Sequence, residues 1–342
     1  VSETDYWNYN QLNEAQKRVY RVLQENALAM PEQPFAVAHL EDLPITEISI
    51  CYLALRNDHP EYFWLPNSYS TSLIDDTFYF RFTNPNESQN DSENFYPFSK
   101  QERDAKVDHL TKTIQEIFRS RLHRSMSDYE RELALYQWLV EHCSYDSDTA
   151  LGTVERPQSY QSYGALVDGL AVCEGYARAF QLLCYYAGIN CTLVTGTDQN
   201  LGGHMWNMTQ IGGDWYMNDV TWDDTDRDGM MSYLYFNQTT AVLEGNHIFD
   251  PNLSDHPGGE FNFNLPECTA TQFNYYVLNH LIAHSADELQ TLLSERILQA
   301  AADESHWVTV RCSYRTFEDY TQIEAIVNPI IQSLNQSSLP SD

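Results

Sequence analysis

The sequence predicts an α+β protein, because helical periodicity occurs near both ends of the chain and strand alternation surrounds a glycine turn in its middle. Residues 10–30 carry Leu12, Val19 and Leu23 at near-helical spacing and predict an amphipathic helix. Residues 203–219 alternate in polarity on both sides of a Gly-Gly pair, which predicts a β-hairpin. These patterns together predict a mixture of helices and antiparallel strands.

The composition is that of a folded, strongly acidic protein. The 342 residues are 42% hydrophobic, and 19 Lys and Arg against 49 Asp and Glu give a formal net charge of −30. Such a charge repels phosphate backbones and anionic membranes, so we expect no nucleic-acid partner. No apolar run reaches the roughly 18 residues of a membrane span. The chain starts at Val1 rather than Met, which indicates a trimmed or processed start.

The N-terminal part of the chain predicts further helices and one strand. Residues 45–65 are typical of a helix that ends at Pro60, and residues 71–82 have the alternation and aromatic content of a strand. Residues 83–94 have almost nothing to bury, so we expect an exposed loop there. A further helix is expected from residue 99 to about residue 122.

A helix start opens the central part of the chain. Ser127 and Glu130 form an S-x-x-E capping box, which predicts a helix over residues 128–143. The polar residues 144–162 then form a long connection, and connections of this length in a compact domain are often functional. We therefore place the start of the catalytic region near residue 125.

The C-terminal part predicts a helix, a strand and a helix. Residues 285–302 have helical periodicity, residues 306–314 have strand composition, and residues 317–335 predict a helix that bends or breaks near Pro329. The expected result is a small α-β-α region.

Among the seven cysteines, Cys173 stands where a loop turns into a helix. Tyr176, Phe180, Leu183 and Ala187 form one apolar stripe after it, and Cys173 lies on the same stripe. Its sulfur would face the protein body at a helix N-terminus, where free N–H groups favour a thiolate. The alternative is a core cysteine that happens to begin a helix, and this segment alone does not decide between the two.

The other cysteines show no such setting. They have irregular spacing and no CxxC pair, which argues against a zinc ribbon or a disulfide scaffold. Four of them lie in apolar runs and are expected to be small buried residues: Cys51, Cys184, Cys191 and Cys312.

A partner for the cysteine lies in the predicted hairpin. If Gly212 and Gly213 form the two-residue turn, residues whose numbers sum to 425 face one another, so Trp206 opposes Asp219 and His204 opposes Thr221. His204 and Asp219 then share one face as diagonal neighbours. The order Cys, His, Asp supplies a nucleophile, a base and an orienting carboxylate for attack on an acyl carbon. Zinc is the rival chemistry, but these three ligands are too few for a closed structural site.

Three segments in this order resemble the transglutaminase-like superfamily, in particular its bacterial members: "YGALVDGLAVCEGYARAFQLL", "HMWNMTQIGGDWYMNDVTWDD" and "YLYFN". The resemblance covers about residues 125–268. It implies a papain-like core, with a central helix packed on an antiparallel sheet and with Cys173, His204 and Asp219 as the catalytic triad. Relatives usually read HAWN where this chain has Met205, and we expect that side chain to point away from the triad.

The resemblance also suggests residues around the triad. The family tends to place an oxyanion-stabilising side chain shortly before the cysteine, where this chain has Ser162 and Tyr163. Tyr163 is our candidate, with a packing role as the alternative, and the backbone N–H of Cys173 is a further donor. Trp206 and Trp222 are expected to line the acyl-binding cleft, to pack in the core, or to do both.

A short acidic motif calls for a separate interpretation. Asp224, Asp226, Asp228 and Gly229 match the first half of a D-x-D-x-D-G calcium loop. Position twelve of such a loop needs an acidic residue, and here it is Tyr235. We therefore expect an exposed acidic turn and predict no metal or cofactor.

The leading hypothesis is a thiol acyl-transfer enzyme that acts on a peptide or a glutamine carboxamide, with water as the favoured acceptor. An amine acceptor would make it a protein cross-linker, and a catalytically idle surface interaction module is the alternative from another class. The expected partner is a protein or peptide, including cell-wall peptide, in an extracellular or cell-surface location. The expected regions are an N-terminal accessory region, a catalytic domain and a C-terminal α-β-α region: residues 1–124, 125–268 and 269–342.

Overall fold

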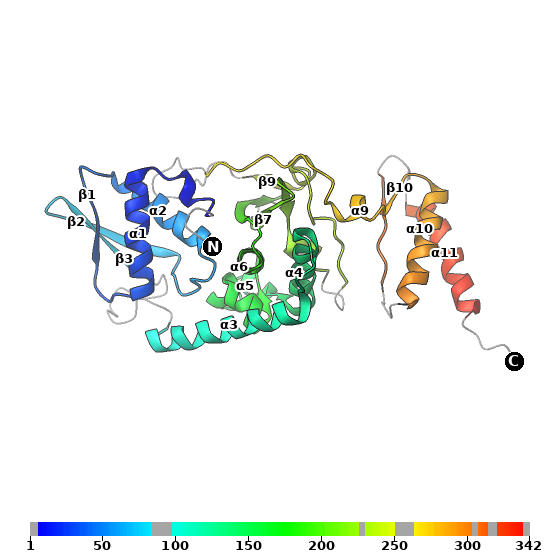
Figure 1. Cartoon of the computed structure of the whole chain (residues 1–342), viewed down its shortest axis with the longest axis horizontal. Coiled ribbons are helices and arrows are strands. Elements are labelled where there is room, and N and C mark those ends of the chain that lie inside the picture. The colour runs from blue at the N-terminus through cyan, green and yellow to red at the C-terminus, as the bar shows by residue number, and fades with distance from the viewer. Residues whose placement is uncertain are drawn as a thin grey trace.

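The computed structural model describes residues 6–83, 98–200, 202–225, 230–249, 263–302, 307–313 and 320–337. The chain folds as an α+β protein in which three groups of elements follow one another (Figure 1). The N-terminal group consists of η2 (Tyr9–Gln11), α1 (Glu14–Ala29), β1 (Phe35–His39), α2 (Ile45–Asp58), β2 (Ser68–Ile74) and β3 (Thr77–Thr83). The central group begins with α3 (Lys100–Arg121), α4 (Asp128–His142), β4 (Ser144–Tyr145), α5 (Ser147–Ala150), η3 (Pro157–Tyr160), η4 (Gly164–Asp168), β5 (Leu170–Ala171) and α6 (Cys173–Ala187).

The central group continues with its main sheet, and a C-terminal group follows it. The remaining central elements are β6 (Cys191–Asp198), β7 (Gly203–Ile211), β8 (Asp214–Asn218), α7 (Val220–Asp223), α8 (Thr240–Leu243) and β9 (His247–Phe249). The C-terminal elements are α9 (Tyr275–Leu278), β10 (Ile282–Ala283), α10 (Ala286–Ala302), β11 (Arg311–Cys312) and α11 (Tyr320–Ser337). In Figure 1, α10 and α11 lie side by side at the end of the molecule opposite the N-terminal group.

In the N-terminal group, two helices accompany a three-stranded antiparallel sheet with the order β1-β3-β2. Phe78, Phe80 and Phe82 of β3 are buried and alternate with half-buried residues, as the two-residue period of a strand requires. The helices predicted over residues 10–30 and 45–65 are confirmed as α1 and α2.

The single strand predicted over residues 71–82 is wrong, because this segment is a hairpin. β2 and β3 pair antiparallel from Ser68↔Thr83 to Ile74↔Thr77. The turn residues Asp75 and Asp76 both have positive φ, 46° and 59°. Asp tolerates this left-handed conformation, and two such residues fit a tight hairpin. The remainder of the loop expected at 83–94 lies outside the described residues.

Capping boxes begin the two long helices that lead into the central group. The Ser99 hydroxyl accepts the backbone N–H of Glu102, whose carboxylate accepts the Ser99 N–H, and Ser127 and Glu130 make the same exchange at α4. Both helices were predicted, and both are confirmed. In Figure 1, α3 runs along one side of the molecule from near the N-terminal group to the central group.

The centre of the fold is α6, which packs on β6 and β7 of a four-stranded antiparallel sheet. The sheet order is β8-β7-β6-β9. Tyr176, Phe180 and Leu183, which belong to the predicted apolar stripe, are fully buried, and α4 covers another side of the helix. The first residue of α6 is Cys173, so this packing fixes the position of the cysteine.

The connection before α6 has more structure than its polar sequence predicts. It contains β4, α5 and η3, and β4 pairs in parallel with β5. The connection is pressed against the start of α6: a Cβ atom on Gly175 would lie 2.3 Å from the carbonyl oxygen of Ser159. Glycine is therefore required there, because a Cβ at that distance would collide with backbone.

The C-terminal group has the expected helix, strand and helix, preceded by the short helix α9 and the strand β10. The strand expected over residues 306–314 is limited to β11 in the described residues, and it pairs in parallel with β10. Pro329 lies inside α11. None of the described helices is both long enough and apolar enough to cross a membrane.

A buried glutamate connects α4 to the hairpin of β7 and β8. Glu132 is fully buried and accepts hydrogen bonds from Thr209, Asn218 and Asn237. Burial raises its pKa to about 7, against the opposing effect of these three hydrogen bonds. The group therefore binds a proton more strongly in the folded chain than in the unfolded chain.

This raised pKa predicts a stability that falls with pH. The contribution of Glu132 is present below its unfolded pKa of 4.5 and is lost as pH rises through about 7. We expect Glu132→Gln to reduce the loss of unfolding free energy between about pH 5 and 8 by about 2–3 kcal/mol. Urea unfolding at several pH values measures this, with Glu116→Gln on the exposed face of α3 as control. Parallel pH curves for Glu132→Gln and wild type would contradict it.

Candidate active site

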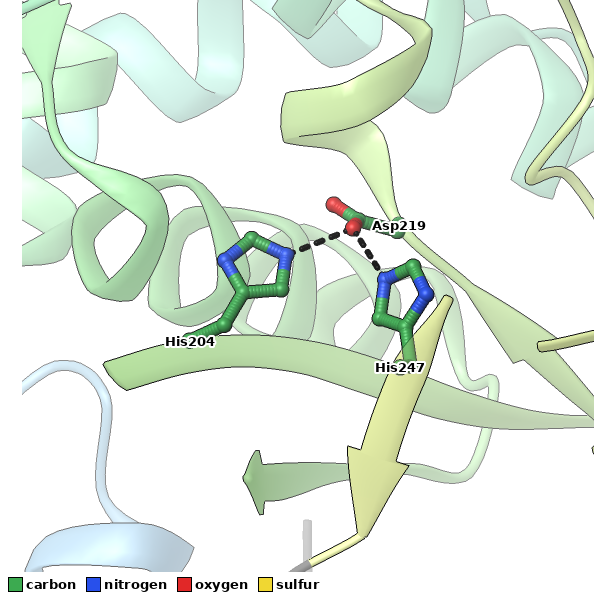
Figure 2. A group of neighbouring side chains, drawn as sticks. All are labelled: His204, Asp219 and His247. Carbon is green, nitrogen blue, oxygen red and sulfur yellow. Dashed lines mark hydrogen bonds and ion pairs between the residues drawn. The ribbon is translucent and has the colours of Figure 1, made fainter. Parts of the chain in front are cut away.

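Three buried side chains from separate elements meet at one carboxylate oxygen. His204 of β7, Asp219 between β8 and α7, and His247 of β9 form this cluster (Figure 2). The Nε2 atom of His204 lies 2.6 Å and the Nε2 atom of His247 2.9 Å from Oδ2 of Asp219. A carboxylate only accepts, so both imidazoles donate to Asp219.

The sheet order brings the two histidines together. β6 lies between β7 and β9, and its Gly196 pairs with His204 on one side and with Phe249 on the other. A Cβ on Gly196 would lie 2.2 Å from the carbonyl oxygen of Ile248 and 2.8 Å from the Trp206 ring. The glycine therefore lets the two neighbouring strands approach closely enough for both rings to reach Asp219.

Asp219 reaches the cluster by leaving the strand rather than by pairing in it. The predicted register holds from Ile211↔Asp214 to Asn207↔Asn218, but β8 ends there. The expected pairs Trp206–Asp219 and His204–Thr221 are therefore wrong. Asp219 instead caps α7, with its Oδ1 accepting the Trp222 N–H at 3.2 Å, and its own N–H donates to the Tyr235 carbonyl. The cap turns the carboxylate toward His204.

Cys173 is half-buried at the first position of α6, and the structure brings it to His204. A hydrogen bond and the charge of Cys173 both contribute to the shift in the pKa of His204. Since Nε2 of His204 is bonded to Asp219, Nδ1 is the ring nitrogen that can meet the thiol. Cys173 is therefore close to the hydrogen-bonded pair of His204 and Asp219.

The electrostatics of this site favour an imidazolium. Burial lowers the pKa of His204, but Asp219 and then Cys173 outweigh burial and raise it to about 10. Burial would raise the pKa of Asp219, yet His204 and His247 hold it below its usual value. Asp219 is therefore charged when His204 holds a proton, as an orienting carboxylate must be.

Aromatic rings enclose the two histidines. The ring of Trp206 lies 5.6 Å from His204 and 4.9 Å from His247, and the ring of Trp222 lies 5.6 Å and 4.5 Å from the same two rings. Trp206 is fully buried, so it packs in the core, whereas Trp222 is half-buried. That either ring contacts an acyl group stays a prediction.

Tyr163 and Ser162 lie apart from the cluster. The Tyr163 hydroxyl bonds Nδ1 of His109 at 3.3 Å, and its ring packs on Phe63. The Ser162 hydroxyl donates to the carbonyl of Pro60. An oxyanion role for Tyr163 stays a prediction, and these contacts give it a packing role in the resting structure.

Sequence analysis missed His247 and two tyrosines near the cysteine. The pKa of Tyr145 is raised to about 12, first by burial and then by the charge of Cys173, and that of Tyr160 is raised by burial, Glu174 and Cys173. Both hydroxyls are thus close enough to sense the sulfur. His247 begins the three-residue strand β9, which is too short to carry a periodic signal in the sequence.

The cluster also offers the donor types of a metal site, because one atom each from His204, Asp219 and His247 lies within 4.8 Å of the others. Two ligands of a tetrahedral zinc, each about 2.0–2.1 Å from the ion, lie roughly 3.3 Å apart. The contacts of 2.6 and 2.9 Å are shorter and match charge-assisted hydrogen bonds. Hydrogen bonding therefore explains the geometry of this cluster better than metal ligation.

The calcium motif is only partly described. Oδ2 of Asp224 accepts the Tyr176 hydroxyl at 2.6 Å, and Tyr235 at position twelve contacts Asn246. Asp226, Asp228 and Gly229 lie outside the described residues, so the exposed acidic turn stays a prediction.

The geometry defines a cysteine–histidine–aspartate site on an α+β core, with the cysteine at the start of the central helix. Residues 116–220 match the family model of the transglutaminase-like superfamily, and this stretch contains Cys173, His204 and Asp219. The chain therefore carries a transglutaminase-like domain, as the resemblance implied. His247 lies beyond the matched stretch.

The chain is also similar to particular proteins over part of its length. Kyphoscoliosis peptidase of Mus musculus is 30% identical over 120 residues, and the same protein of Homo sapiens is 29% identical over 120 residues. Each alignment covers 32% of this chain but only 18% of the relative. A solved structure described as a TGase is similar with a TM-score of 0.32 and 16% identity, over 47% of this chain and 46% of the other.

Proposed function

We propose that the chain is a thiol acyl-transfer enzyme that hydrolyses a peptide bond or a glutamine carboxamide. The observation that carries the proposal is the buried His204–Asp219 pair, with Cys173 close to His204 at the N-terminus of α6. The similarity to two proteins named as peptidases supports water as the acceptor. The charge of −30 suits a substrate region that is neutral or basic.

The proposed reaction uses each of these three residues. The Cys173 thiolate attacks the carbonyl carbon, and the His204 imidazolium gives its proton to the departing amine or ammonia as the C–N bond breaks. His204 then takes a proton from water, whose oxygen displaces the sulfur and releases a carboxylic acid. A primary amine in place of water would give a new amide, and the enzyme would be a cross-linker.

The proposal predicts a selective reaction of Cys173. We expect iodoacetamide at about pH 6 to modify Cys173 at least 10-fold faster than any other cysteine, because the imidazolium stabilises its thiolate. Burial raises the pKa of the Cys51, Cys184, Cys268 and Cys312 thiols and so slows them. Peptide mapping measures the rates. Equal rates at several cysteines would favour the idle interaction module.

The acceptor is tested on the same protein. Intact mass after incubation with glutamine-containing peptides, with and without a primary amine, distinguishes an acid product from an amine adduct. An acid product in both samples supports the proposal of a hydrolase. If the amine adduct is the main product when the amine is present, the proposal of a cross-linker replaces it.

His247 holds Asp219 in this scheme and acts as a positioning residue. Its Nε2 donates to the oxygen that also accepts from His204, and its Nδ1 lies 2.7 Å from Oδ1 of Asn246. Asn246 in turn donates to the Tyr235 hydroxyl at 2.7 Å. This series of contacts fixes the ring, and the hydrogen bond of His247 is one cause of the low pKa of Asp219.

Removing the His247 donor should therefore shift the pH dependence of activity. His247→Phe keeps a ring but lets the pKa of Asp219 rise, so the carboxylate becomes protonated at a higher pH and stops orienting His204. We expect kcat/KM to fall roughly 10- to 100-fold, the effect typical of lost supporting hydrogen bonds, with the acidic limb moved to higher pH. His247→Gln, which keeps an N–H donor, should recover part of the lost kcat/KM and part of the shift in the acidic limb. The exposed His39→Phe is the control, and an equal loss at every pH would indicate a purely structural role.

A further inference from the structure

A cavity of about 430 Å³ lies between the N-terminal group and the connection that precedes the cysteine. Its volume falls within the range of roughly 300–1,000 Å³ that is typical of ligand sites. The lining residues come from three places: the segment after α2, Phe98 just before α3, and the segment around α5 and η3. The side chains that carry the argument are Phe63, Leu65, Phe98, Val154, Arg156 and Tyr160.

The cavity is connected to the start of α6 through η3, which contributes Tyr160 to its lining. The neighbouring Ser159 accepts the N–H of Val172, and the same carbonyl oxygen allows only glycine at position 175. The last turn of η3 is thus fixed against the first turn of α6. Tyr160 lines the cavity and lies close enough to Cys173 for that charge to contribute to its raised pKa, after burial and Glu174. Tyr160 therefore lines the cavity from η3, the element whose backbone packs on the first turn of α6.

The apolar part of the wall suits a neutral aromatic group, and polar side chains such as Glu155 and Gln158 line the rest. Phe63 and Leu65 are almost fully buried, and Phe98 is half-buried next to Phe63 at a ring distance of 6.0 Å. The guanidinium of Arg156 is held at 2.7 Å by the buried Asp146 and at 3.8 Å by Asp148. Its charge is therefore neutralised within the protein and does not favour an anionic ligand. Aromatic side chains fill such apolar walls and interact edge to face with their rings.

We propose that this cavity binds an aromatic side chain of the acyl-donor peptide, close to the carbonyl that Cys173 attacks. The inference rests on the proposed function and adds a substrate class to it. It also assigns a role to the N-terminal group, which supplies Phe63 and Leu65 as one wall of a specificity site. The triad then performs the chemistry, and the cavity selects the peptide.

The test uses peptidyl chloromethyl ketones that carry Phe, Ala or Asp at one, two or three residues from the reactive carbon. Labelling of Cys173 is followed by intact mass. Iodoacetamide, which has no side chain to fill the cavity, measures the reactivity of the Cys173 thiol alone. We expect Phe at one of these positions to raise the labelling rate at least 10-fold over Ala and Asp, since a pocket that gains one apolar group discriminates by 10–200-fold. Equal rates for Phe, Ala and Asp at every position, with fast iodoacetamide labelling, would overturn the cavity proposal and leave the proposed function standing.

A pair of variants on one loop locates the effect. Val154 lines the cavity and is 39% exposed, so Val154→Asp places a charge in the apolar space without burying it in the core. We expect this variant to lose the Phe preference by 10-fold or more and to keep its iodoacetamide rate. Leu151, which is 77% exposed on the same loop and outside the lining, gives the control Leu151→Asp, which should keep the preference. A Phe preference unchanged in Val154→Asp would overturn this placement.

A binding arm separates the cavity from catalysis. The Cys173→Ala protein is titrated with the best Phe peptide and with its Ala counterpart, both as amides without the reactive group, in the presence and absence of Val154→Asp. If the Phe peptide binds more tightly than the Ala peptide, and Val154→Asp removes this difference, the cavity proposal is supported. This holds even if Cys173 reacts with none of the reagents, because that failure would end the enzyme proposal alone. Equal binding of the two peptides would overturn the cavity proposal.

Discussion

Replacing Cys173 with Ala should abolish turnover, because no other atom at the start of α6 can form the thioester. The expected loss is roughly 10⁶-fold, the scale seen when a catalytic nucleophile is removed. Mass spectrometry of the protein mixed with substrate should show no acyl adduct. The change removes one half-buried sulfur, so the melting temperature should stay close to that of wild type.

Cys312 offers a matched control for this prediction. It is the other half-buried cysteine, and it lies in the C-terminal group. Cys312→Ala should retain full activity and full acyl labelling. If Cys173→Ala kept wild-type activity, the enzyme proposal would give way to the interaction module.

Asp219→Asn should nearly eliminate activity while preserving the nucleophile. Oδ2 of Asp219 accepts from two imidazoles, and an amide placed there must either lose one of these bonds or turn an N–H toward them. If the N–H of the new Asn side chain pointed at Nε2, the neutral His204 would carry its proton on Nδ1 instead of Nε2. Nδ1 would then be unable to accept a proton from Cys173. Comparable triads lose about 10⁴-fold in kcat when the orienting carboxylate becomes an amide.

The mark of this variant is a slow enzyme that still forms a thioester. Rapid-quench mass spectrometry should detect acylated Cys173 in Asp219→Asn, at a reduced rate, and none in Cys173→Ala. Thermal unfolding is the control for folding, since Asp219 is fully buried and also caps α7. A stable Asp219→Asn protein with wild-type kcat would remove Asp219 from the proposed triad.

Much of the local structure could be predicted because local rules determine it. The capping boxes at Ser99 and Ser127 identify helix starts through bonds that span three residues. The Gly212–Gly213 turn sets the register of β7 and β8, since a two-residue loop leaves one pairing for the strands that leave it. An error arose where the turn residues were less common ones. Asp75 and Asp76 form a turn with positive φ, and this segment was predicted as part of one strand.

Part of the site was predictable for the same reason. Cys173 lies at a helix start and His204 on a strand of the hairpin, so short-range patterns place both on the right elements, whereas Asp219 lies one residue beyond the end of β8, the strand predicted for it. The segments also resemble a known superfamily, which supplied the order and the roles. The sequence did not indicate that β8 would end at Asn218, since the cap that turns Asp219 depends on contacts with α7 and Tyr235.

The sequence by itself thus determined the long helices, the capping boxes of α3 and α4, the turn between β7 and β8, and the three residues of the candidate triad. Only the tertiary structure decided that His247 shares the carboxylate of Asp219, because β9 reaches the cluster by pairing with β6 across about fifty residues of chain. The same holds for the cavity at Tyr160, whose walls come from segments on either side of α3. Such contacts leave no periodic signal, since their energy depends on packing between distant elements and not on the spacing of residues within one element.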